Sequence, residues 1–271
     1  MLATGEGFAD ALSGSYLAQI KGAPMLITNA KNASKVNTYI INHLSSGGQV
    51  YVLGGTQAIP ASWISGLSGN GFTITRISGK TRYLTNLQIL KKANVTGGNL
   101  LIATGTNYAD ALSASGVSLP ILLVGKSLTS EQKTFLAGLT DPKFHILGGT
   151  LAVSTNVENA LKTYGSLNRI AGDTRYETSR QIGNRLVASP DTAILVTGRN
   201  FPDGLAAGPL ARYLNAPILL VNAPGGGAAA DSNEAYKLIR DKDIEKGIVL
   251  GGPTLITPAA VRNAFIISYD V

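Results

Sequence analysis

The residues closest to a known chemical motif are Gly5-Glu6-Gly7, which directly follow an apolar stretch. Such a glycine pair opens dinucleotide-binding loops, where the second glycine lets the backbone approach a pyrophosphate. The segment occurs twice more in the chain, and there Gly7 is replaced by Asn107 and Asn200. The glycine that a phosphate needs is therefore not part of the pattern, which indicates a strand-to-helix turn instead.

Three aspartates, Asp10, Asp110 and Asp203, occupy the same place in each copy of this segment. The place follows a strand, where open α/β sheets bind ligands, so each could be a site carboxylate. Aspartate is also a common helix N-cap, and we favour this structural role in the turn. A magnesium site would need several converging oxygen ligands, and the one Asp-x-Asp pair of the sequence is Asp241 and Asp243, on a polar stretch of a single copy. We therefore expect no metal and no catalytic residue.

Nucleophilic and thiol chemistry find no support in the sequence. The chain has no cysteine, which excludes disulfides, zinc–thiolate sites and thiol catalysis. Its two histidines, His43 and His145, stand at different places in their repeats and lack a nucleophile motif beside them. The Lys-Ser and Lys-Thr pairs lack the glycine-rich lead of a P-loop. We expect packing or solvated histidines and no cofactor.

Four arginines recur in pairs, because Arg76 and Arg82 in one copy correspond to Arg169 and Arg175 in the next. A guanidinium group can bind a carboxylate or a phosphate through two hydrogen bonds. The four side chains are therefore candidate contacts for an anionic polymer. They could equally form ion pairs between units, for example with the recurring aspartates, and both roles stay open.

Composition narrows the range of partners. The net charge of +7 and the pI of about 9.5 suit nucleic acid, anionic lipid or an acidic polysaccharide, and are equally typical of a merely basic protein. No tract of Lys and Arg marks a nucleic-acid tail, and aromatic residues make up only 6%. No apolar stretch reaches about 18 residues, so we expect no membrane span. No signal peptide is visible at the start of the sequence.

Internal repetition organises the whole chain of 271 residues. Each copy has the strand-to-helix segment, a proline-led strand and a Leu-Gly-Gly turn, and the later two copies open with an Arg-Tyr segment. In chain order these landmarks are 3–13, 23–28, 52–60, 76–85, 103–113, 119–124, 146–154, 169–178, 196–206, 216–221 and 249–257. We therefore divide the chain into three units, 1–75, 76–168 and 169–271.

Each unit alternates apolar strands with helical stretches, which predicts α/β units with parallel sheets and right-handed crossovers. The strands are apolar throughout, so helices should cover both faces of each sheet. Units this small, without linkers, should pack as a pseudo-threefold cluster in a monomer. The first unit lacks the Arg-Tyr segment, so we expect a fragment of a longer protein. We interpret the stretch at 223–235, rich in Gly and Ala, as a lengthened flexible loop.

The pattern R-I-x-G-x-x-R-Y, then T-G-x-x-[FY]-x-D-x-L, then P-I-L-L-V, then L-G-G, resembles the cell wall binding repeat 2 family of Gram-positive, clostridial-type surface proteins. The resemblance covers almost the whole chain. It implies three tandem Toprim-like or Rossmann-like modules packed as a trimer within one chain. It also implies non-covalent anchoring through basic residues near module boundaries and an apolar I-L-L motif. That motif maps to Ile121, Leu122, Leu123, Ile218, Leu219 and Leu220, and the first copy departs from it with Met25, Leu26 and Ile27.

These observations favour a non-catalytic anchor for an anionic cell-wall polymer, teichoic-acid-like or a phosphate-bearing polysaccharide, at the bacterial surface. The I-L-L strands could serve this role directly or only as core, since a buried parallel strand has the same composition. Three alternatives remain. The chain could belong to a cell-wall amidase or protease whose catalytic domain lies elsewhere, it could be a nucleotide-binding Rossmann-like protein, or it could be a structural component of a surface layer.

Overall fold

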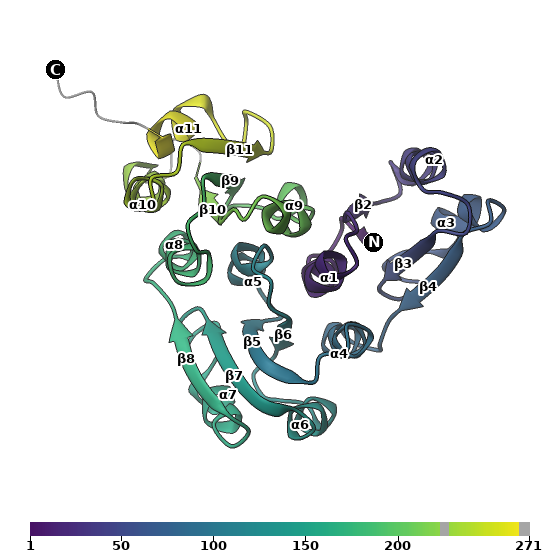
Figure 1. Cartoon of the computed structure of the whole chain (residues 1–271), viewed down its shortest axis with the longest axis horizontal. Coiled ribbons are helices and arrows are strands. Elements are labelled where there is room, and N and C mark those ends of the chain that lie inside the picture. Colours follow the sequence, from purple (N-terminus) through teal and green to yellow (C-terminus); the bar gives the residue numbers. More distant parts are fainter. Residues whose placement is uncertain (223–227, 266–271) are drawn as a thin grey trace.

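A computed structural model of the chain, which describes residues 1–222 and 228–265, contains three α/β units around a common centre (Figure 1). The first unit has a parallel sheet with the strand order β2-β1-β3-β4. Its elements are β1 (Leu2–Thr4), α1 (Ala9–Ile20), β2 (Leu26–Thr28), α2 (Ala33–His43), β3 (Gln49–Leu53), α3 (Ala61–Ser68) and β4 (Thr73–Ile77).

The second unit repeats this topology, with a parallel sheet ordered β6-β5-β7-β8. Strand β5 pairs in register with β6, for example Leu101 with Ile121, and its register with β7 shifts between Gly97 and Asn99. Its elements are α4 (Arg82–Lys92), β5 (Gly97–Thr104), α5 (Ala109–Ala114), β6 (Ile121–Val124), α6 (Ser130–Ala137), β7 (Thr140–Leu147), α7 (Thr155–Leu161) and β8 (Ser166–Ile170).

The third unit has a parallel sheet of β10-β9-β11 among the described residues. Its elements are α8 (Arg175–Leu186), β9 (Thr192–Thr197), the 3-10 turn η1 (Pro202–Gly204), α9 (Ala207–Tyr213), β10 (Ile218–Val221), α10 (Ala228–Asp241), β11 (Lys246–Leu250) and α11 (Pro258–Phe265). The predicted loop at 223–235 is wrong from Ala228 onward, because α10 begins there. Its first part, 223–227, lies outside the described residues.

One face of every sheet contributes to a single central core. Leu53, Leu147 and Val196, one from each sheet, are buried in the same hydrophobic cluster. The other faces form three separate outer cores, covered by α2 and α3, by α6 and α7, and by α10 and α11. Apolar side chains therefore alternate between two buried faces along β5, β6, β9 and β10, which accounts for their continuous apolar runs.

The helices that follow the repeated turns, α1, α5 and α9, meet at the centre of the molecule (Figure 1). A Cβ at Gly208 would contact Ser15 and the backbone of Ser115, one from each of the other units. Helices can approach this closely only where small residues face each other. The three α/β units, their parallel sheets and their packing are thus confirmed, and the fold does not single out the Toprim variant.

The sequence repeat and the sheets are offset from each other. Arg76 lies in β4 and Arg169 lies in β8, and each of these strands completes the sheet of the preceding unit. The segment that opens one repeat is therefore also the last strand of the sheet before it. This shared segment ties consecutive units together.

Candidate polymer-binding site

The repeated turns bring one aromatic side chain from each unit to a common point. The ring centroids of Phe8 and Tyr108 are 6.2 Å apart, those of Phe8 and Phe201 are 5.8 Å apart, and those of Tyr108 and Phe201 are 5.5 Å apart. Edge-on and tilted contacts at such distances are favourable for aromatic rings. The aromatic position of the repeat therefore locks the three turns together.

Arg82 and Arg175 link this aromatic cluster to the turn of their own unit. Arg82 Nη1 donates to Gly105 O at 2.6 Å, and its Cζ lies 5.4 Å from the centre of the Phe8 ring in the preceding unit. Arg175 Nη1 donates to Gly198 O at 2.7 Å, and its Cζ lies 5.6 Å from the centre of the Tyr108 ring. Both arginines therefore stand at unit boundaries, as cation–π partners of an aromatic side chain from the neighbouring unit.

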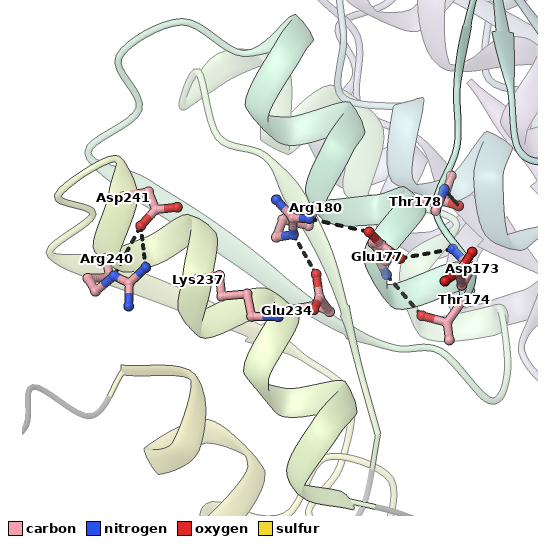
Figure 2. A network of polar contacts seen from close by, with 10 residues as sticks. Asp173, Thr174, Glu177, Thr178, Arg180, Glu234, Lys237, Arg240 and Asp241 are labelled. Atoms are coloured by element: carbon pink, nitrogen blue, oxygen red, sulfur yellow. Dashed lines mark hydrogen bonds and ion pairs between the residues drawn. The ribbon is translucent and has the colours of Figure 1, made fainter.

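The first turns of α4 and α8 set the direction of these arginines. The hydroxyls of Thr81 and Thr174 are the N-caps and accept hydrogen bonds from the backbone three residues on. Figure 2 shows that the Glu177 carboxylate accepts a hydrogen bond from the backbone N of Asp173, the residue before this N-cap, at 2.9 Å. The Thr-x-x-Glu spacing has the form of a capping box, which the sequence analysis missed, but here the glutamate bonds the residue before the cap.

The aspartates do not act as helix caps, contrary to the sequence-based expectation. The N-cap positions of α1 and α5 are Phe8 and Tyr108, and neither makes a side-chain capping bond. Asp10 and Asp110 stand two residues further on, in the first helical turn, and Asp203 lies within η1. A capping side chain must precede the helix, so these carboxylates have a different role.

Each carboxylate instead faces the first glycine of a Leu-Gly-Gly turn. Gly54 and Gly148 have φ angles of +102° and +86°, and a Cβ on either would collide with the carboxylate of Asp10 or Asp110. The two landmarks are thus in contact, which explains why both recur. Burial raises the pKa of Asp10 and Asp110, and the arginine of the following unit, Arg82 or Arg175, partly offsets this. The arginines therefore do act on the aspartates across unit boundaries.

Arg76 and Arg169 hold the same turns from the other side. Arg76 donates to Gly54 O at 2.8 Å and to Ile59 O at 2.9 Å. Arg169 donates to Gly148 O and Val153 O, and it pairs with Glu158 at 2.6 Å. These guanidinium groups are engaged within the protein, so the structure gives them a structural role at the turn.

The I-L-L side chains are core and cannot touch a polymer in this structure. Ile121, Leu122 and Leu123, like Ile218, Leu219 and Leu220, are at most 1% exposed. Direct contact, one of the two roles left open by the sequence, is therefore wrong. The reason is that Leu122 faces the outer core while its two neighbours face the central core.

Two polar residues that the sequence analysis missed form hydrogen bonds with the backbone at the outer edges of β6 and β10. Asn86 of α4 donates to Ile121 O at 2.8 Å and accepts from Leu123 N at 3.0 Å. Ser179 of α8 makes both corresponding bonds in the third unit, each at 3.0 Å. Each residue follows its Arg-Tyr arginine by four positions, and this shared spacing was the available signal.

A groove opens beside the turns at the boundary of the first two units, and we call it the turn groove. It has a volume of about 840 Å³. The first turn and the start of α1 contribute Glu6, Phe8 and Asp10, and the third unit contributes Phe201. The exposed cations are Lys80, just before α4, and Arg82, the first residue of α4. Hydroxyls line it as well, namely Thr4, Thr56, Thr81 and Thr85.

The remaining candidate residues lie apart from this groove. His43 Nδ1 contacts Tyr39 O at 2.8 Å, and the ring of His145 bridges Asn168 and Asn99 on the second sheet. Asp241 pairs with Arg240 at the end of α10 (Figure 2). Within residues 1–222 and 228–265, no three His, Cys, Asp or Glu side chains are grouped so that they could hold a metal ion. No helix in this part of the chain is long and apolar enough to cross a membrane.

Three tandem α/β units around one core, with contacts repeated at each boundary, define a repeat-built binding module. The family model of cell wall binding domain 2 (CWB2) matches residues 1–64, 76–158 and 169–261. The chain belongs to this family. The domain binds cell-wall polymer and is associated with the cell wall and the cell surface.

Known relatives and neighbours agree with this family. The chain is 29% identical over 262 residues to N-acetylmuramoyl-L-alanine amidase LytC of Bacillus subtilis, and the match covers 94% of the chain and 51% of that protein. It is 30% identical over 230 residues to the amidase enhancer of the same organism, covering 83% of the chain and 31% of that protein. The chain thus spans about half or less of the length of these relatives.

Among solved structures, Cwp8 from Clostridium difficile superposes with a TM-score of 0.84 at 25% identity, covering 97% of this chain and 46% of that one. Cwp6 from the same organism superposes with a TM-score of 0.81 at 23% identity, covering 93% of this chain and 41% of that one, and its likeness concerns the fold alone. The three-unit arrangement is therefore shared with surface proteins of a Gram-positive bacterium.

Proposed function

We propose that the chain is a non-catalytic anchor that holds a surface protein on an anionic cell-wall polymer, with the turn groove as its principal contact. The observation that carries this proposal is the pair of exposed cations in the groove. Lys80 forms no ion pair within the described part of the chain. Arg82 donates one hydrogen bond, from Nη1 to Gly105 O. Both present charge to a ligand in the groove, where hydroxyl groups and aromatic edges suit a sugar backbone.

The boundary between the second and third units offers a weaker version of the same arrangement. Arg175 corresponds to Arg82, whereas Asp173 takes the position of Lys80. A polymer that spans both boundaries would gain affinity from two weak contacts on one rigid scaffold. Binding of this kind decreases as salt is added, because exposed charges are screened.

Retention on purified walls tests the proposal. Wild-type protein should bind walls at low salt, release at high salt, and fail to bind walls whose anionic polymers have been extracted with acid. Lys80→Ala should weaken retention by about two- to fivefold, the effect of one exposed charge, while Lys31→Ala, an exposed lysine outside the groove, should not. Binding that survives extraction would point to peptidoglycan, and salt-independent binding would refute the electrostatic mechanism.

A second candidate function is supported by the relatives. The chain matches half of an amidase and a third of an amidase enhancer, so it can be the wall-targeting part of a hydrolase whose catalytic domain lies outside these residues. Adding the chain in excess to an intact wall amidase would then compete for the same wall sites and slow wall lysis.

Nucleotide binding is less well supported by the geometry. In α1 and α5 the first turn carries a carboxylate, which opposes the binding of a phosphate at a helix N-terminus. A thermal shift on addition of NAD or ATP would contradict this assessment.

A further inference from the structure

A second groove lies where the third unit meets the first, and we call it the α9–β2 groove. It has a volume of about 600 Å³ and lies between the end of α1, the connection to β2, and α9. Tyr213 at its rim is 86% exposed. The lining is mainly apolar, with Ala18, Ala23, Pro24, Met25, Pro209 and Leu210.

The corresponding space at the other two boundaries is filled by a helix. Helix α4 packs between α1 of the first unit and β6 of the second, and α8 packs between α5 of the second unit and β10 of the third. The third position in this series lies between α9 and β2, which is where the α9–β2 groove opens (Figure 1).

The outer edge of β2 carries backbone polar groups whose equivalents in β6 and β10 form hydrogen bonds with a side chain of a neighbouring helix. Met25 O and Ile27 N correspond to Ile121 O and Leu123 N, which bond to Asn86. The β1–β2 ladder uses the neighbouring residues, as in Leu26 N to Met1 O and Gly5 N to Thr28 O, so Met25 O and Ile27 N point away from β1. No described residue bonds to either group.

Two further side chains, Gln19 in the groove and Asp203 of the third unit, are consistent with an unfilled position at this boundary. Gln19, which lines the groove, donates to Ser115 O, but its Oε1 is buried without a partner in the described structure. Asp203 is exposed, whereas Asp10 and Asp110 are half-buried beside an arginine of the following unit.

We propose that the α9–β2 groove binds an amphipathic helix of the same kind as α4 and α8, with the sequence pattern Arg-Tyr-x-Thr-[Asn/Ser] at its start. The Asn or Ser side chain bonds Met25 O and Ile27 N, as Asn86 does on β6. The arginine lies beside Asp203, as Arg82 lies beside Asp10. The apolar face of the helix covers Met25 and Leu210, and the groove thereby closes the ring of three units.

A fusion tests this proposal directly. A copy of residues 76–100 is joined ahead of Met1, because Leu101 corresponds to Met1 in the repeat and the register is then the native one. The matched control carries alanine in that copy at the positions of Arg82 and Asn86. The expected result is slower hydrogen exchange at the Ile27 amide, by about tenfold or more as for an amide newly held in a protein hydrogen bond, together with a higher melting temperature. The control should show neither effect.

Equal exchange at Ile27 in the fusion, the control and the original chain would overturn the proposal. So would concentration-dependent protection of Ile27 in the original chain with a dimer in sedimentation, because a second copy would then cover the groove. A Tyr213→Ala substitution in the fusion should reduce the gain in melting temperature, while Tyr39→Ala, at an exposed tyrosine on α2, should leave it unchanged.

Discussion

Replacing Asn86 by alanine should destabilise the protein strongly, because this fully buried side chain serves two units at once. It donates to Ile121 O and to Ser13 Oγ of the first unit, and it accepts from Leu123 N. Alanine leaves two buried backbone groups without partners, each at a cost of about 1–3 kcal/mol. The free energy of unfolding should therefore fall by about 2–6 kcal/mol.

Equilibrium urea unfolding, followed by circular dichroism, measures this change. Asn86→Ser should recover part of the loss, since Ser179 makes both backbone bonds in the third unit with a shorter side chain. Gln88→Ala, at an exposed position of the same helix, is the control and should change stability by less than about 0.5 kcal/mol. If Asn86→Ala is as stable as Gln88→Ala, the bonds between helix and strand edge contribute nothing, and the α9–β2 groove loses its main argument.

Two further predictions concern the contact between aspartate and glycine. Gly148→Ala should reduce stability by about 1–3 kcal/mol, because φ is +86° and the new Cβ collides with the Asp110 carboxylate. Gly149→Ala, which has open space around it, should have little effect, and equal losses would contradict the model of the turn. Because burial raises the pKa of Asp110 above 3.8, its stabilising contribution is complete below that pH and is lost as pH rises through the folded-state pKa. Asp110→Asn should therefore become more stable relative to wild type between about pH 3.5 and pH 7, and a constant difference in urea unfolding would refute this.

Much of the fold could be predicted because the same order of strand, turn and helix motifs occurs three times in the sequence. Strands that are apolar on both faces, alternating with helices, specify parallel sheets covered on two sides. The aromatic and aspartate positions of the turns were also recognisable. The role of Asp10 was not, because the sequence shows its place after a strand but not that α1 begins one residue before it. A helix boundary shifted by two positions converts a cap into a first-turn residue.

The candidate site could be predicted only in part. The sequence indicated four arginines as equal candidates for polymer binding. The guanidinium groups of Arg76 and Arg169, however, donate hydrogen bonds to carbonyls of the Leu-Gly-Gly turn. Only Arg82 and Arg175 reach the boundary between units, since they start a helix rather than lie in a strand. Lys80 was not predicted, because it has no counterpart in the next copy and the repeat directed attention to shared residues.

The sequence by itself determined the number of units, their α/β character and their family, because these follow from local periodicity and from motifs that recur along the chain. Tertiary structure alone decided which charged residues remain available for a ligand and where the grooves lie. Both depend on contacts between segments far apart in the chain, such as Phe8 with Phe201 and Asn86 with Ser13. No local pattern records such contacts, since they arise only when three similar units pack around one core.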